Sequence, residues 1–99
     1  MLTITAIIRA RKGYEQAMSQ ALLEVAEHVR ENEAATVGFF VSQDLSDPRV
    51  FTTYERFADQ AAMDTHNGSP VVARFFGIAK PILDGEVTLV TSQEVSSKA

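Results

Sequence analysis

The sequence of 99 residues contains no cysteine, few glycines and prolines, and little positive charge. Without cysteine there are no disulfides, iron–sulfur clusters or thiolate-bound zinc ions, and we expect a protein of the reducing cytoplasm. No apolar run approaches the roughly 20 residues that a membrane-spanning helix needs, so no membrane partner is expected. Near the N-terminus the basic residues follow the apolar run 4–8, which is the wrong order for a signal peptide.

Nine basic residues face thirteen acidic ones, and the formal net charge is −4. The one basic cluster is Arg9, Arg11 and Lys12. Nucleic-acid binding needs a positive surface, so it is not expected. The five glycines form neither GxGxxG nor GxxxxGKS/T, and His28 and His66 stand in no HxH or HExxH motif. The sequence therefore predicts no nucleotide, flavin or other cofactor and no metal site.

The apolar share of 45% and the charged share of 22% are those of an ordinary globular protein, and we expect one domain over residues 1–99. Hydrophobic periodicity, caps and turn residues predict the elements in this order: strand 2–10, helix 14–32, strand 36–43, strand 49–57, helix 59–67, helix 69–80, strand 86–95 and a frayed tail 96–99. This order is a split βαβ pair, the ferredoxin-like α+β fold. Both helical segments should cover one face of a four-stranded antiparallel sheet.

The first predicted helix has a single apolar stripe, made of Tyr14, Met18, Leu22, Val25 and Val29. Its acidic residues fall on the other side, as expected for a face in water, and His28 among them reads as a surface residue.

Three of the predicted strands carry large apolar residues on both faces. The adjacent pairs are Ile7 and Ile8, Phe39 and Phe40, and Val50 and Phe51. A sheet with one face in water should alternate apolar and polar residues instead. We therefore expect a homodimer formed through the open sheet face. Scattered exposed apolar residues are the alternative reading.

One stretch combines a strand with a histidine-bearing helix. Glu55 shares a strand face with Phe51 and Phe57, and His66 shares the apolar helix face of Met63. Packing of that helix on the sheet would bring the imidazole ring close to the carboxyl group of Glu55.

The residues of this stretch resemble the antibiotic biosynthesis monooxygenase (ABM) domain. The matching residues are Tyr54-Glu55-Arg56-Phe57, Asp59, Ala61-Ala62-Met63, His66, Ser69-Pro70 and Phe75-Phe76, with Arg9-Ala10, Gly13, Gly38-Phe39 and the turn 44–48 upstream. The resemblance implies a small dimeric α+β barrel. Some members of the family oxidise quinols or aromatic polyketides with molecular oxygen and no cofactor. Others isomerise a small phosphorylated dione, degrade haem, or have no known activity.

Haem-degrading members use an asparagine, a tryptophan and a haem-ligating histidine at positions that correspond here to Thr5 or Ala6, Phe57 and Phe76. None of these residues can ligate iron, which argues against haem degradation. Many quinol-type members also carry tryptophan in place of Phe57, and phenylalanine still provides an aromatic wall.

The resemblance favours a quinol-type monooxygenase that acts on a small hydroxyaromatic substrate and O2. In that reading His66 is the base and Glu55 orients it or stabilises its charge. The substrate would lie against aromatic residues, with the candidates Phe39, Phe51, Tyr54, Phe57, Phe75 and Phe76. The structural alternatives are a packed histidine, a salt bridge of Glu55 at the sheet edge, phenylalanines of the core, and Tyr54 on the dimer surface.

Two other functions stay open. A non-catalytic ligand-binding or interaction domain would have His66 and Glu55 fully hydrogen-bonded or exposed, with the space between sheet and helices filled. An isomerase would need cationic groups for a phosphate, for which Arg9, Arg56 and Arg74 are the candidates.

Overall fold

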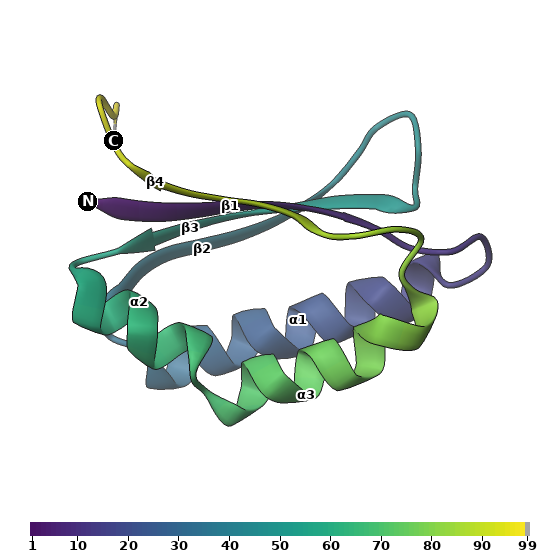
Figure 1. Cartoon of the computed structure of the whole chain (residues 1–99), viewed down its shortest axis with the longest axis horizontal. Helices are drawn as coiled ribbons and strands as arrows, with labels where there is room; N and C mark the ends of the chain where they lie inside the picture. The colour runs from purple at the N-terminus through teal and green to yellow at the C-terminus, as the bar shows by residue number, and fades with distance from the viewer. Residues whose placement is uncertain (99) are drawn as a thin grey trace.

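The computed structural model describes residues 1–98, which form a sheet covered on one face by helices (Figure 1). The elements are β1 (Leu2–Arg9), α1 (Glu15–Asn32), β2 (Thr36–Gln43), β3 (Val50–Phe57), α2 (Gln60–Asn67), α3 (Pro70–Ala79), the 3-10 turn η1 (Lys80–Ile82) and β4 (Thr88–Gln93). No helix among these residues combines the length and the apolar content that crossing a membrane requires.

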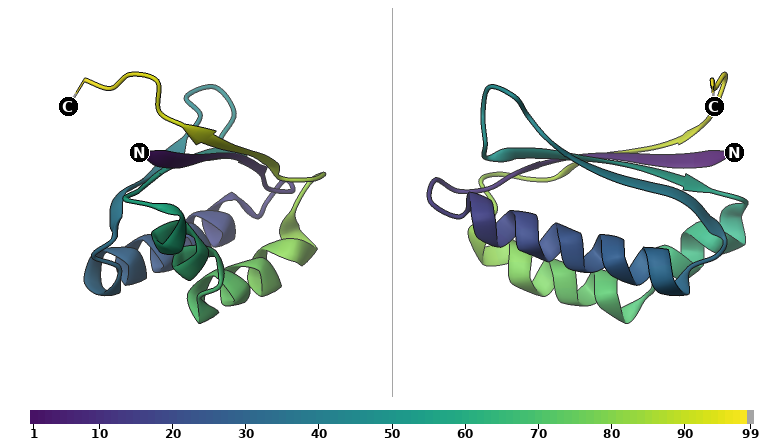
Figure 2. Two further views of the ribbon diagram at one scale, coloured as in Figure 1. Left: turned by 60° about the vertical axis from the view of Figure 1, so that its left-hand side comes forward. Right: turned by 180° about the vertical axis from the view of Figure 1, so that it is seen from behind.

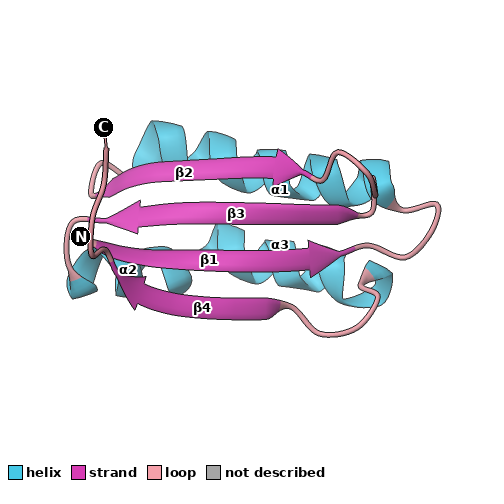
Figure 3. Ribbon diagram, turned by 90° about the horizontal axis from the view of Figure 1, so that it is seen from above, coloured by secondary structure: helices cyan, strands magenta, loops and turns pink. Residues whose placement is uncertain are grey.

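The strands form one antiparallel sheet in the order β2-β3-β1-β4, which Figure 3 shows from above. The helices lie beneath that sheet, and its other face is open (Figure 2). This is the ferredoxin-like α+β arrangement that the sequence predicts. Alternation in β3 is regular: Phe51, Thr53, Glu55 and Phe57 are buried toward the helices, while Tyr54 is exposed on the open face.

The last strand, Thr88–Gln93, is shorter than the predicted 86–95 at both ends and pairs with Leu2 to Ile7 of β1. Before the N-terminal end of β4, Leu83 and Asp84 already pair with the chain at the C-terminal end of β1. The chain then leaves the sheet through the turn at Gly85. Residues 96–98 form no helix or strand, and the final position of the predicted frayed tail, residue 99, lies outside the described residues.

Two caps fix where α2 and α3 begin. The Asp59 carboxylate accepts a hydrogen bond of 2.8 Å from the backbone N–H of Ala62. The Ser69 hydroxyl accepts one of 3.4 Å from Val72, and Pro70 occupies the first turn of α3. Both caps are the predicted ones. Tyr14, in contrast, precedes α1 and is 48% exposed, so its predicted place in the buried stripe is wrong.

The core is divided into two clusters. The larger one lies between α1, α3 and one end of the sheet, and the smaller one consists of Ile4, Phe57, Ala62 and Met63 at the end covered by α2. Side chains from both clusters, such as Ile4 and Val25, line a cavity. The division of the core therefore positions the candidate site, because the cavity occupies the space where the clusters do not meet.

Candidate functional site

A cavity of about 230 Å³ lies between the sheet and the helices. Its walls are aliphatic and aromatic side chains from every layer of the fold, including Ile8, Leu22, Val72 and Phe75. Phe76 and Leu89 line it as well and are 49% and 60% exposed, so the cavity reaches solvent beside the edge strand β4. Ligand pockets typically measure about 300–1,000 Å³, so this one fits a small apolar molecule.

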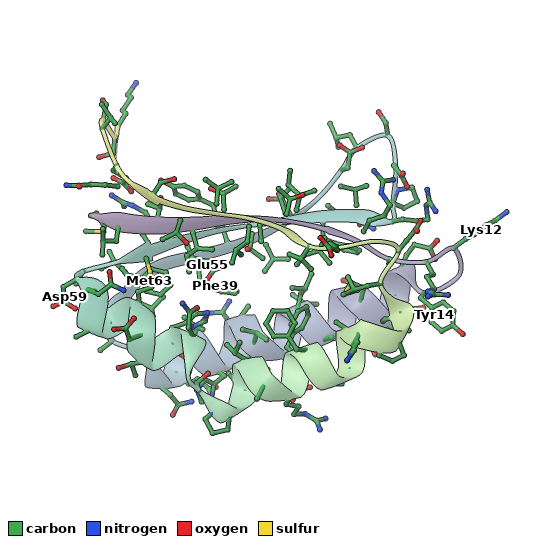
Figure 4. The ribbon with its side chains drawn as sticks, viewed as in Figure 1. Lys12, Tyr14, Phe39, Glu55, Asp59 and Met63 are labelled. Atoms are coloured by element: carbon green, nitrogen blue, oxygen red, sulfur yellow. The ribbon has the colours of Figure 1, made fainter. Side chains whose placement is uncertain are left out.

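Glu55 brings a carboxyl group into this apolar cavity. It lies in the middle of β3, in register with Ile4 of β1 and Phe39 of β2, and points toward the helices (Figure 4). The residue is 7% exposed. Its Oε2 accepts a hydrogen bond of 2.8 Å from the hydroxyl of Thr53, two positions earlier on the same strand face. A buried carboxyl group so placed must be held by other polar groups or bind a proton.

His66 provides the main partner of Glu55. Its ring is held between Phe39 and Phe57, with centroid distances of 5.5 and 5.4 Å. Nε2 lies 3.2 Å from Oε1 of Glu55, as the strand alternation and the helix spacing predict. The side chain of His66 is only 5% exposed, and both His66 and Glu55 line the cavity.

A second carboxylate contacts the other side of the same ring. Glu33, the C-cap residue of α1, receives a hydrogen bond of 2.8 Å from Nδ1 of His66 and another of 2.8 Å from the hydroxyl of Thr36. Sequence reasoning missed this residue, because its position after the helix carries no pattern that points to α2. The imidazole ring of His28 also lies close to Glu33, with its Nε2 3.6 Å from Oε2 of Glu33. His28 therefore belongs to this cluster and is not simply a surface residue.

The pKa of His66 reflects two opposing causes. Burial of the ring disfavours its charged form and lowers the pKa, but the contacts with Glu55 and Glu33 and the attraction of both carboxylates raise it by more. The net result is a pKa above the ordinary value of histidine. The site therefore favours an imidazolium ring between two carboxylates.

Only half of the predicted substrate-contacting aromatic residues line the cavity. Phe39, Phe75 and Phe76 do so. Phe51 and Phe57 are buried on the correct face but lie toward opposite ends of β3, inside the two core clusters. Tyr54 lies on the open sheet face, where its hydroxyl donates a 3.1 Å hydrogen bond to Glu94. Contrary to the prediction, these last three residues do not line the cavity.

The arginines considered for a phosphate also lie elsewhere. Arg9 pairs with Asp47, Arg74 with Glu24, and Arg56 with Glu94, and none of the three arginines lines the cavity. Within residues 1–98, no group of three or more His, Cys, Asp or Glu side chains is arranged to hold a metal ion.

The fold and the site define a small ferredoxin-like domain whose apolar cavity contains a carboxylate–imidazole pair. The family model described as antibiotic biosynthesis monooxygenase matches residues 1–77, and the chain belongs to this family. The resemblance noted in the sequence is thereby confirmed.

Solved structures share the fold over nearly the whole chain. A crystal structure of an antibiotic biosynthesis monooxygenase is 22% identical, with a TM-score of 0.88 and coverage of 97% of this chain and 100% of that one. PA3566 from Pseudomonas aeruginosa is 25% identical, with a TM-score of 0.87 and coverage of 96% and 94%. Rv0793 from Mycobacterium tuberculosis is 17% identical, with a TM-score of 0.89 and coverage of 99% and 98%. No curated protein sequence matches the chain closely enough to indicate a relationship.

Proposed function

We propose that this protein is a cofactor-independent monooxygenase that oxidises a small hydroxyaromatic compound or quinol with molecular oxygen. The observation that carries the proposal is the apolar cavity with Glu55 and His66 in its wall. An apolar cavity suits both an aromatic ring and O2, and the buried acid–imidazole pair can receive and return a proton beside them.

The reaction needs one proton acceptor at its start. Glu55 takes the proton of a substrate hydroxyl group, and the resulting aryloxide is electron-rich enough to reduce O2. A carbon–oxygen bond forms at a ring carbon that bears hydrogen, and protonation of the outer oxygen gives a hydroperoxide. Loss of that carbon's hydrogen as a proton breaks the O–O bond, leaving a carbonyl group and water. Overall, the hydroxyaromatic compound and O2 give a quinone and water, with no external reductant.

The contacts of His66 favour Glu55 as the base. Both ring nitrogens of His66 face carboxylate oxygens, and its raised pKa favours the charged ring. A charged imidazole cannot accept a proton, but it can stabilise the aryloxide that forms next to it. The isomerase reading loses support, because no candidate arginine lines the cavity. The binding-domain reading keeps one supporting observation, since Glu55 and His66 are both held by neighbours.

Oxygen uptake with a panel of quinols and hydroxynaphthoquinols, with no cofactor added, tests the proposed activity. We expect uptake above the rate of autoxidation with wild type.

Leu89→Trp, at the exposed side of the cavity, should reduce kcat/KM about tenfold or more by narrowing the cavity, which corresponds to losing ~1.4 kcal/mol of binding. Leu23→Trp, at a 56% exposed position of α1 outside the cavity wall, is the matched control. Equal rates in both variants would place the reaction outside this cavity, and no uptake across the panel would favour the binding domain.

We also propose that two copies associate through the open sheet face. One row of residues crosses the sheet there, from Phe40 through Tyr54 and Thr5 to Val90. Phe40 and Val90 are 57% and 50% exposed, and the rings of Phe40 and Tyr54 stack at 6.4 Å. A face of this kind is typical of a symmetric interface between identical subunits.

Phe40→Asp is therefore expected to make the protein monomeric. A charge at the β2 end of the row should weaken association by ~2 kcal/mol or more, which is about a 30-fold rise in Kd. Light scattering coupled to size-exclusion chromatography, over a series of protein concentrations, measures the change. Leu23→Asp introduces the same charge at an exposed position on the helical side and should leave the dimer intact. A monomeric wild type would refute the proposed interface.

A further inference from the structure

Glu33 has a feature that an ordinary ion pair with His66 does not explain. Its Oε1 is fully engaged, with Nδ1 of His66 and the hydroxyl of Thr36 both at 2.8 Å. Its Oε2 is buried and has no hydrogen-bond partner among the described residues. Nε2 of His28 lies 3.6 Å from Oε2, which is beyond hydrogen-bond distance. A buried oxygen without a hydrogen-bond partner carries a free-energy cost, and its presence in a folded protein therefore calls for an explanation.

Glu33 also lies at the boundary between two separate spaces. His66 lines the apolar cavity, and Glu33 does not. Glu33 instead lines a second hollow of about 370 Å³, between the end of α1 and the start of α2, with Asn32, Thr36, Asp59 and Thr65 among its walls. His66 does not line this second hollow. The hydrogen bond between Nδ1 and Oε1 thus connects an apolar space with a more polar one.

The charge of the ring follows from what faces each nitrogen. Nδ1 donates to Glu33, so a neutral ring would direct the lone pair of Nε2 at Oε1 of Glu55, 3.2 Å away. A carboxylate accepts hydrogen bonds and cannot donate to that lone pair. Protonation of Nε2 replaces this repulsion with an attractive contact. Within residues 1–98, Glu33 and Glu55 are the titratable groups in contact with the ring, and His66 and His28 are those near Glu33.

We infer that Glu33 is a positioning residue of the candidate site, which keeps His66 doubly protonated and links it to the second hollow. This inference rests on the proposed oxygenase function for its catalytic consequence. With His66 charged by Glu33, Glu55 remains the group that receives the substrate proton. That proton stays on Glu55, because both nitrogens of the charged ring already carry a proton and cannot accept another. The overall reaction consumes no net proton, so Glu55 gives this proton back by the time water leaves.

The inference predicts a specific change in the titration of His66. Glu33→Gln keeps an oxygen that can accept from Nδ1 but removes the negative charge. Loss of an opposite charge at this distance should lower the titration midpoint of the His66 ring by about one unit or more. The midpoint is measured from the ring proton and carbon resonances of His66 by NMR, in the full chain. Glu31→Gln removes one charge at the exposed end of α1 and should leave the midpoint within a few tenths of wild type.

The same variants separate this inference from the proposed reaction. With an active substrate, Glu33→Gln should move the pH profile of kcat/KM to lower pH in parallel with the His66 midpoint. Glu33→Asp keeps the negative charge, so its pH profile should lie closer to that of wild type. An unchanged midpoint in Glu33→Gln, or an equal change in Glu31→Gln, overturns the role of Glu33 whether or not the protein is active. Absence of oxygen uptake by wild type would refute the reaction, and the NMR titration would still decide the role of Glu33.

Discussion

Replacing Glu55 with glutamine is expected to lower kcat/KM for oxygen uptake about 10²- to 10⁴-fold, the range that one general base contributes. Glutamine has nearly the same shape and can still accept the hydrogen bond of the Thr53 hydroxyl, but it cannot take a proton from the substrate. The aryloxide would then have to form in water and enter the apolar cavity as an ion, which is costly. Initial rates with the best quinol of the panel, above autoxidation, give the ratio.

Two controls make this result specific to the base. Glu27→Gln changes the same group at an exposed position of α1 and should leave kcat/KM unchanged. A substrate supplied at a pH above its own pKa arrives already deprotonated, so the deficit of Glu55→Gln should shrink there. Full activity of Glu55→Gln at every pH would assign proton removal to another group.

The order of the helices and strands could be predicted because each of them carries its own hydrophobic periodicity, cap or turn residues. Strand alternation placed Glu55 on the helix-facing side, and spacing along α2 placed His66 beside Met63 on the buried side. Those two patterns suffice to bring the ring and the carboxyl group together, and the structure puts them at 3.2 Å. The ends of β4 could not be predicted in this way, because they depend on where the chain leaves β1 after Asp84 and pairs with it again from Thr88.

Glu33 could not be predicted for a different reason. It follows α1 directly, where an acidic residue ordinarily faces water. Its contact with His66 spans 33 positions and depends on how closely α2 approaches the α1–β2 connection. The sequence offers one indirect signal. Glu33 stands three positions before Thr36 at the start of β2, so the Thr36 hydroxyl can donate a hydrogen bond to the Glu33 carboxylate. Only the packed structure shows that the ring has a second acidic partner.

The aromatic residues show the limit of alternation. Alternation assigns a side chain to a face of the sheet, and it separates Tyr54 on the open face from Phe51 and Phe57 on the covered one. It says nothing of the position along the strand. The cavity spans only the middle of β3, at Thr53 and Glu55, so both phenylalanines fall beyond it into solid core. A pocket prediction therefore needs the lengths and packing of the helices as well.

Replacing His66 with leucine is expected to lower the free energy of unfolding by about 3–5 kcal/mol near pH 6, the cost typical of removing one partner from a buried ion pair. The side chains of Glu33 and Glu55 are each 9% exposed, so both would lose their cationic partner in a place that water hardly reaches. Leucine roughly preserves the volume of the ring, so packing contributes little to the loss. Urea unfolding of wild type and variant over a range of pH measures it.

The pH dependence of this difference has a definite sign. Because the pKa of His66 is raised in the folded state, its stabilising contribution is complete below the unfolded value of about 6.5 and is lost as the pH rises through the folded value. The gap between wild type and His66→Leu should therefore be widest at mildly acid pH and narrow toward alkaline pH. A triple variant that adds Glu33→Gln and Glu55→Gln removes the charges of the ring and of its two carboxylate partners, and it should recover much of the lost stability. A triple variant as unstable as His66→Leu alone would show that the ring contributes by its shape and not by its charge.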